Sequence, residues 1–213
     1  MEPMARGERG AGRLRVVGGE ARGRPLLTPP GRSLRPTTAL VRRALFDIVG
    51  AGIVGASVVD AYAGVGGVGL EALSRGAATV TFVERDRMSL TCLRSNVDRL
   101  GYAARATVVA AAVRPWLARH PLAPVQLVVC DPPYASQTGD GVAPGSEAEQ
   151  VLGAIADNLE RWPGVGAPAP SPAPLVVVEH HRGVELPAAV GPLACIRAER
   201  YGTTMLSFYR RAR

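Results

Sequence analysis

From Ser57 onward, short runs of β-forming residues alternate with helical stretches, and this alternation constrains the fold more than any other feature of the chain. Strands that are separated by helices pair in parallel and are covered by those helices, so the pattern predicts an α/β fold with a doubly wound parallel sheet. The predicted strands cover residues 58–61, 79–83, 106–110, 125–130 and 175–179, and the predicted helices cover 67–74, 87–100, 113–119 and 147–160.

The two ends of the chain depart from this alternation. Residues 195–200 and 203–209 are strand-like and no helix separates them, so they must pair antiparallel. Residues 39–49 have helical periodicity, and Thr37 or Thr38 can cap that helix. The segments 14–17 and 24–27 flank a Gly- and Arg-containing turn, which is typical of a β-hairpin. The predicted organisation is a disordered basic tail (1–12), a β-hairpin extension (13–36) and one α/β domain (37–213).

A glycine-rich turn joins the first strand of the alternating region to its helix. Gly64, Gly66 and Gly69 form a GxGxxG pattern in the strand-to-helix context that this motif requires. Such a turn lets a ligand approach the backbone closely, beside the amide groups of a helix N-terminus. Glu84 ends the next strand 20 positions after Gly64, where a carboxylate commonly binds ribose hydroxyls. The sequence therefore predicts a site for an adenosine-containing cofactor, and NAD, FAD and S-adenosylmethionine are all compatible with it.

A second motif follows the fourth predicted strand, where the chain reads Asp131-Pro132-Pro133-Tyr134. Consecutive prolines have fixed φ and no N–H, so this turn is stiff and its carbonyl groups are free to accept hydrogen bonds. A base amine could donate to the Asp131 carboxylate and the Pro132 carbonyl, which would favour a pyramidal nitrogen with its lone pair aimed at a methyl donor. Tyr134 would stack on the base. These four residues are therefore the predicted catalytic residues of a base-amine methyltransferase.

Charge is concentrated near the N-terminus. Residues 1–43 contain ten Arg and three acidic residues, so this segment carries the entire formal net charge of +7. A focused basic segment is typical of nucleic-acid binding, although a solvated tail that maintains solubility has the same composition. Arg15, Arg22, Arg24 and Arg35 are the candidate RNA-binding residues.

No metal site, disulfide or membrane anchor is expected. The chain has three Cys and three His, without a CxxC pair or a ligand-like spacing, and the adjacent His180 and His181 are expected to lie in a loop after a strand. No stretch is long and apolar enough to span a membrane, and the basic N-terminus lacks the apolar region of a signal peptide. We therefore expect a cytoplasmic monomer.

Taken together, these motifs resemble those of the class I S-adenosylmethionine-dependent methyltransferases, whose sheet is Rossmann-like. More narrowly, the chain is similar to the RsmD-type bacterial 16S rRNA guanine-N2 methyltransferases. The matching segments span nearly the whole chain: 35–38 with the helix to Phe46, 63–76, 83–87, 131–134 and 199–204.

The resemblance implies a sheet of seven strands, with the last strand antiparallel. It also implies that the cofactor is S-adenosylmethionine, held by Asp60, Gly64, Gly66, Gly69 and Glu84, with its methionine carboxylate at the glycine turn. Residues 131–134 would hold a guanine of 16S rRNA or of the small ribosomal subunit.

The chain departs from the family pattern after its third strand. Many relatives have Asp or Asn where this chain reads Ala110-Ala111-Ala112. Adenine recognition would then depend on the backbone near Ala112 and Val113.

Three alternatives remain open at this point. Asp131–Tyr134 would also suit an adenine-N6 methyltransferase acting on RNA or DNA, although the short chain has no large target-recognition domain. A non-catalytic RNA-binding or ribosome-assembly protein could retain the same fold. An NAD-dependent oxidoreductase would also use the glycine motif, but it has no evident need for the Pro-Pro turn.

Overall fold

The structure is a computed structural model of the 213-residue chain, and it describes residues 14–30, 38–122, 125–133, 146–161 and 173–212. The described residues form a mixed sheet of eight strands in the order β3-β2-β1-β4-β5-β8-β7-β6. The strands are β1 Ser57–Ala61, β2 Thr79–Glu84, β3 Ala106–Ala110, β4 Leu127–Cys130, β5 Leu175–His181, β6 Ala189–Val190, β7 Leu193–Tyr201 and β8 Thr204–Arg211.

Strands β1 to β5 pair in parallel, whereas β8 lies antiparallel between β5 and β7. The predicted α/β class and the antiparallel last strand are therefore confirmed. The predicted count of seven strands is wrong, because β6 adds an eighth. This strand contains two residues, and it forms where the turn at Gly191 (φ 49°) folds Ala189–Val190 back onto Leu193 and Ala194. Two residues are too few for a periodic pattern to be recognised in a sequence.

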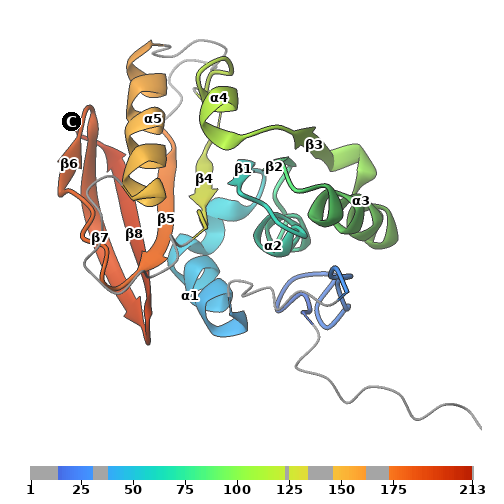
Figure 1. The fold of residues 1–213 in the computed structure, drawn as a ribbon. Helices are drawn as coiled ribbons and strands as arrows, with labels where there is room; N and C mark the ends of the chain where they lie inside the picture. Colours follow the sequence, from blue (N-terminus) through green and yellow to red (C-terminus); the bar gives the residue numbers. More distant parts are fainter. Residues whose placement is uncertain (1–13, 31–37, 123–124, 134–145, 162–172, 213) are drawn as a thin grey trace, which may run out of the picture.

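Helices cover both faces of the sheet (Figure 1). The residues of α1 Ala39–Val49, α2 Gly67–Ser74 and α3 Arg87–Leu100 pack in one apolar cluster, and those of α4 Val113–Leu117 and α5 Glu147–Arg161 pack in the other. Short 3₁₀ helices at Gly50–Ile53 and Ala103–Arg105 lead into β1 and β3. The strands β1, β4 and β5 are buried along almost their whole length because both of their faces are covered.

Local capping explains why the predicted helix boundaries are close to the observed ones. Thr38, one of the two predicted caps, accepts a hydrogen bond from Val41 N (3.2 Å) at the start of α1. Asp86 caps α3 in the same way, and Gly101, with φ 77°, ends that helix. Helix α4 ends at Leu117, two residues before its predicted end, and Pro121 four residues later disfavours helical backbone at the residue before it.

The N-terminal segment, defined here as residues 14–30, folds back on itself beside α2 and α3 (Figure 1). The predicted hairpin is reduced to one antiparallel bridge, between Arg15 and Pro25. The hydrogen bonds Val16 N→Arg24 O and Leu26 N→Leu14 O flank this bridge. Val16 and Leu26 are buried in the core with α2 and α3, so the described part of the extension is packed on the domain.

The two adjacent histidines were predicted to lie in a loop, and this prediction is wrong. Both belong to β5, where His180 is buried and its Nε2 lies 2.9 Å from the Ser207 hydroxyl of β8. Burial lowers the pKa of His180, which favours the neutral form of this internal hydrogen-bonding ring.

Candidate functional site

The predicted site residues come together at the carboxyl ends of the parallel strands. Residue pairing places Asp60 of β1 beside Val129 of β4, so that Asp131 follows one step beyond the end of the pairing. Glu84 ends β2 on the other side of β1. Neighbouring strand ends thus bring three carboxylates, 24 to 71 positions apart in the sequence, to one edge of the sheet. This edge is where α/β sheets of this kind bind their ligands.

The turn after β1 has an unusual backbone. Gly64 and Gly66 have φ values of 54° and 88°, and Tyr62 also has a positive φ, of 63°. A positive φ is costly for a bulky residue, so the surrounding contacts must hold Tyr62 in place. Its hydroxyl donates to Glu147 Oε1 of α5 (2.6 Å), and Arg114 Nε lies 3.4 Å from the same carboxylate oxygen. The turn is therefore fixed from the α5 side as well as by its glycines.

The three motif glycines have different roles. A Cβ at Gly69 would lie 2.3 Å from the Phe82 ring, so this glycine is needed for α2 to pack on β2. A Cβ at Gly66 would lie 2.5 Å from Leu93 of α3. A Cβ at Gly64, in contrast, would have no atom of the described residues within 4 Å. Of these three glycines, Gly64 is the one that the described residues leave uncovered, where a ligand could approach the backbone.

Glu84 is already oriented toward this turn. Its Oε2 accepts from Gly64 N (2.8 Å), and its Oε1 accepts from Arg85 N and Asp86 N (both 2.7 Å). The side chain is half-buried. Each carboxylate oxygen has two lone pairs, so these three bonds fix the group, fill Oε1 and leave one lone pair on Oε2 that can accept from a hydroxyl group.

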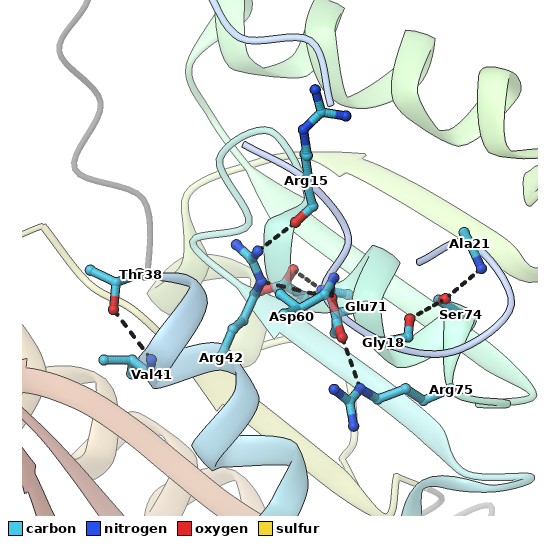
Figure 2. Close-up of polar contacts among 12 residues, drawn as sticks. Arg15, Gly18, Ala21, Thr38, Val41, Arg42, Asp60, Glu71, Ser74 and Arg75 are labelled. Carbon is cyan, nitrogen blue, oxygen red and sulfur yellow. Dashed lines mark hydrogen bonds and ion pairs between the residues drawn. The ribbon is translucent and has the colours of Figure 1, made fainter. Parts of the chain in front are cut away.

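Asp60 lies beneath the turn and is 3% exposed. Its Oδ2 accepts from Gly69 N (2.7 Å), so it holds the first turn of α2 (Figure 2). Burial raises the pKa of this carboxyl to about 7; the Gly69 bond opposes the rise, and the charges of Asp131 and Glu84 add to it. The structure therefore places Asp60 behind the glycine turn and bonded to the backbone.

The Asp131-Pro132-Pro133 turn continues directly from the buried strand β4. Asp131 N donates to Ala61 O at 3.4 Å, so the strand pairing extends to this residue. Asp131 is half-buried, Pro132 is buried and Pro133 is exposed. Burial, with smaller contributions from Asp60 and Asp131, raises the pKa of the preceding Cys130 thiol, which favours its neutral form. Tyr134 lies outside the described residues.

Ala112 and Val113 lie at the start of α4, beside the same edge. Ala112 is the N-terminal cap residue of this helix and offers no side-chain hydrogen bond. Ala111 N donates to Glu84 O (2.9 Å), which ties the end of β3 to the end of β2. Any polar recognition at these positions must come from the backbone.

The candidate RNA-binding arginines differ in how much they are used by the fold. Arg15 donates to Gly23 O (2.8 Å), and Arg24 donates to the carbonyl of Arg99 at the end of α3. Arg22 is exposed at the turn of the segment. Arg35 lies outside the described residues.

Sequence reasoning missed a group of buried polar residues that attach the N-terminal segment. Glu71 is fully buried; its Oε2 accepts from Val17 N (2.6 Å), and its Oε1 pairs with Arg75 Nε (2.8 Å) (Figure 2). Arg42, also buried, donates to Arg15 O (2.6 Å). Asn96 was missed as well. The sequence offered one signal for this group of buried polar residues: Glu71 is a charged residue inside the otherwise apolar helical run 68–73.

Within the described ranges, no group of three or more Cys, His, Asp or Glu residues is arranged to hold a metal ion. None of the described helices has an apolar stretch long enough to cross a membrane.

Residues 14–210 match the protein family described as conserved hypothetical protein 95. YlbH of Bacillus subtilis (strain 168), named as a candidate rRNA methyltransferase, is 32% identical over 202 residues, which cover 93% of this chain and 99% of YlbH. Ribosomal RNA small subunit methyltransferase D of Escherichia coli (strain K12) is 42% identical over 125 residues, which cover 59% of this chain and 62% of that protein. The solved structure of YhhF from Escherichia coli, described as a candidate methyltransferase, has a TM-score of 0.74 at 30% identity and covers 94% of this chain and 98% of that chain.

Proposed function

We propose that this chain, which belongs to the family described as conserved hypothetical protein 95, transfers the methyl group of S-adenosylmethionine to the exocyclic N2 amine of a guanine in 16S rRNA. The observation that carries this proposal is the position of two groups on adjacent strand ends. The Gly64 turn with Glu84 offers a cofactor cradle, and the Asp131-Pro132 turn offers acceptors for a base amine. The names of its relatives as rRNA methyltransferases support the same substrate class.

The residues present fit this cofactor. The Oε2 atom of Glu84 would accept a hydrogen bond from a ribose hydroxyl, and the space at Gly64, where no described residue approaches, would admit the methionine part next to the backbone. The amides of Ala112 and Val113 would serve the adenine. Asp60 would act indirectly, because its carboxylate is bonded to Gly69 N below the turn.

When bound, S-adenosylmethionine supplies a methyl group on a positively charged sulfonium. The charges of Glu84 and Asp131 add to the rise in the pKa of Asp60, so the three carboxyl groups lie close together. This edge of the sheet therefore has a negative potential, which favours a cation. Of the three, Asp131 lies in the turn that follows β4, where it can accept from the substrate amine. Its carboxylate and the Pro132 carbonyl would orient that amine, and Tyr134 would stack on the base.

The N-terminal segment would supply RNA affinity. Arg22 is exposed and, within the described part of the chain, makes no side-chain hydrogen bond like those of Arg15 and Arg24, so its guanidinium would be available for a phosphate. Phosphate contacts of this kind carry affinity and little sequence information. The choice of nucleotide would therefore depend on the Asp131–Tyr134 turn and the shape of the substrate.

The test is methyl transfer from labelled S-adenosylmethionine to small ribosomal subunits that lack the modification, followed by nucleoside analysis. The expected product is N2-methylguanosine. N6-methyladenosine would instead support the adenine alternative, and no product at all, with intact cofactor binding, would support a non-catalytic role.

A variant separates substrate binding from cofactor binding. Asp131→Ala should abolish transfer and leave the Kd of S-adenosylhomocysteine nearly unchanged, as measured by calorimetry, because this carboxylate is assigned to the base. Turnover within a few-fold of wild type would remove Asp131 from the reaction. Binding of a nicotinamide cofactor by the wild type would contradict the proposal as a whole.

A further inference from the structure

Asn96 joins two parts of the molecule that are far apart in the sequence. It lies on α3 and is 1% exposed. Its Oδ1 accepts from Leu27 N (2.7 Å), and its Nδ2 donates to Leu27 O and to Val65 O (both 3.1 Å). One amide group therefore holds the N-terminal segment through Leu27 and the cofactor turn through Val65, which lies between Gly64 and Gly66.

The geometry of this contact makes the two partners interdependent. The bonds to Leu27 N and O orient the amide plane, and that orientation aims the second Nδ2 hydrogen at Val65 O. If the segment moved away from α3, Asn96 would lose two partners in a buried position. A buried amide without partners is costly, so the side chain would turn to find others and would leave Val65 O unsatisfied.

Within the described residues, the other side-chain hydrogen bonds between the segment and α1 or α2 do not involve residues 62–66. Ser74, near the end of α2, accepts from Ala21 N (2.9 Å) and donates to Gly18 O (2.7 Å) (Figure 2). Glu71 and Arg42 bond to Val17 N and Arg15 O. Ser74 therefore holds the same segment with a buried side chain that makes no hydrogen bond to residues 62–66, all of which the structure describes, and it provides a matched control.

We propose that Asn96 is a positioning residue through which the docked N-terminal segment fixes the cofactor turn. The inference rests on the proposed function, because it assigns Gly64–Gly66 to the cofactor and the segment to RNA. Docking of the segment would then increase cofactor affinity. By linkage, cofactor binding would stabilise the docked segment to the same extent. The site that binds the cofactor and the module that binds RNA would be energetically coupled through one side chain.

Three full-length variants test this coupling. Asn96→Ala removes the amide, and Leu27→Pro removes the N–H that donates to Asn96 while leaving Asn96 in place. The Leu27 side chain is 39% exposed, so its replacement sacrifices little packing. Ser74→Ala is the control, since it loosens the segment without altering contacts of the turn. Each variant is compared with wild type by hydrogen exchange of the ligand-free protein and by calorimetry with S-adenosylhomocysteine.

We expect Asn96→Ala and Leu27→Pro to raise the hydrogen-exchange rate both in the N-terminal segment and in residues 63–67. Both variants should also bind S-adenosylhomocysteine about fivefold to tenfold more weakly, which is the scale of one hydrogen bond. Ser74→Ala should raise exchange around residues 18–21 only and change the Kd by less than about twofold, because the Ser74 hydroxyl bonds to Gly18 and Ala21 and not to residues 62–66. If Asn96→Ala does not fold, Leu27→Pro carries the comparison.

Unchanged exchange in residues 63–67 in Leu27→Pro, or an equal loss of affinity in Ser74→Ala, would overturn the proposal. If the wild type does not bind S-adenosylhomocysteine, the proposed function fails, but the exchange comparison in the ligand-free protein still decides whether the segment and the turn are coupled.

Discussion

Replacing Asp60 with Asn should make the protein more stable than wild type at pH 8, and this advantage should shrink as the pH falls. Burial raises the pKa of Asp60 from 3.8 to about 7 in the folded protein. Between these two values the folded state retains a proton that the unfolded state has released. The stability that this proton provides is fully present below pH 4 and is lost as the pH rises through 7. Asn cannot ionise, so the variant does not incur this loss.

The magnitude follows from the two pKa values. A rise from 3.8 to about 7 corresponds to about 4 kcal/mol in the free energy of unfolding, lost at about 1.4 kcal/mol per pH unit. The Asn side chain keeps an oxygen that can accept from Gly69 N, as Oδ2 of Asp60 does at 2.7 Å. We therefore expect the variant to gain about 2–3 kcal/mol on wild type between pH 5 and pH 7.

Urea unfolding followed by circular dichroism at pH 5, 6, 7 and 8, at constant ionic strength, measures this difference. Glu20→Gln is a control without pH dependence in this range: a hydrogen bond from Arg105 lowers the pKa of Glu20 below its ordinary value of 4.5, so above about pH 6 this residue is ionised in both the folded and the unfolded protein. The free-energy difference between Glu20→Gln and wild type should therefore stay constant from about pH 6 to pH 8. A free-energy difference between Asp60→Asn and wild type that does not vary with pH would refute the reasoning. A stability advantage of Asp60→Asn over wild type that decreased as the pH rose would also refute it.

Two further predictions concern the ligands. Glu84→Ala should weaken the binding of S-adenosylmethionine and of S-adenosylhomocysteine by the same amount, about 1.5–3 kcal/mol, because both ligands carry the ribose that is assigned to this carboxylate. Calorimetry measures both affinities, and loss of affinity for one of them alone would contradict that role. Arg22→Glu should weaken RNA binding and reduce its salt dependence, as measured by titration at several salt concentrations. The Kd of the cofactor should not change, because this exposed side chain lies in the N-terminal segment and not in the cofactor turn. An unchanged salt slope would show that Arg22 does not meet phosphate.

Much of the secondary structure, and the meeting of the two predicted motifs at one edge of the sheet, could be predicted from the sequence alone. The helices at residues 39–49, 67–74 and 87–100 and the strand at 106–110 have the predicted boundaries, because their caps and apolar periods are local features. The carboxyl ends of parallel strands meet at one edge, so the topology was enough to bring Glu84 and Asp131 to the same place.

The roles of individual polar side chains were decided only by the tertiary structure. Asp60 stays a predicted cofactor-binding residue, and the structure adds that its side chain is buried and accepts a hydrogen bond from Gly69 N. His180 was expected in a loop and lies inside the sheet. Asn96 carried no signal, because its partners are 69 and 31 positions away. A side chain's hydrogen bonds and pKa depend on which groups surround it after the chain has folded, whereas periodicity and caps depend on neighbours in the sequence.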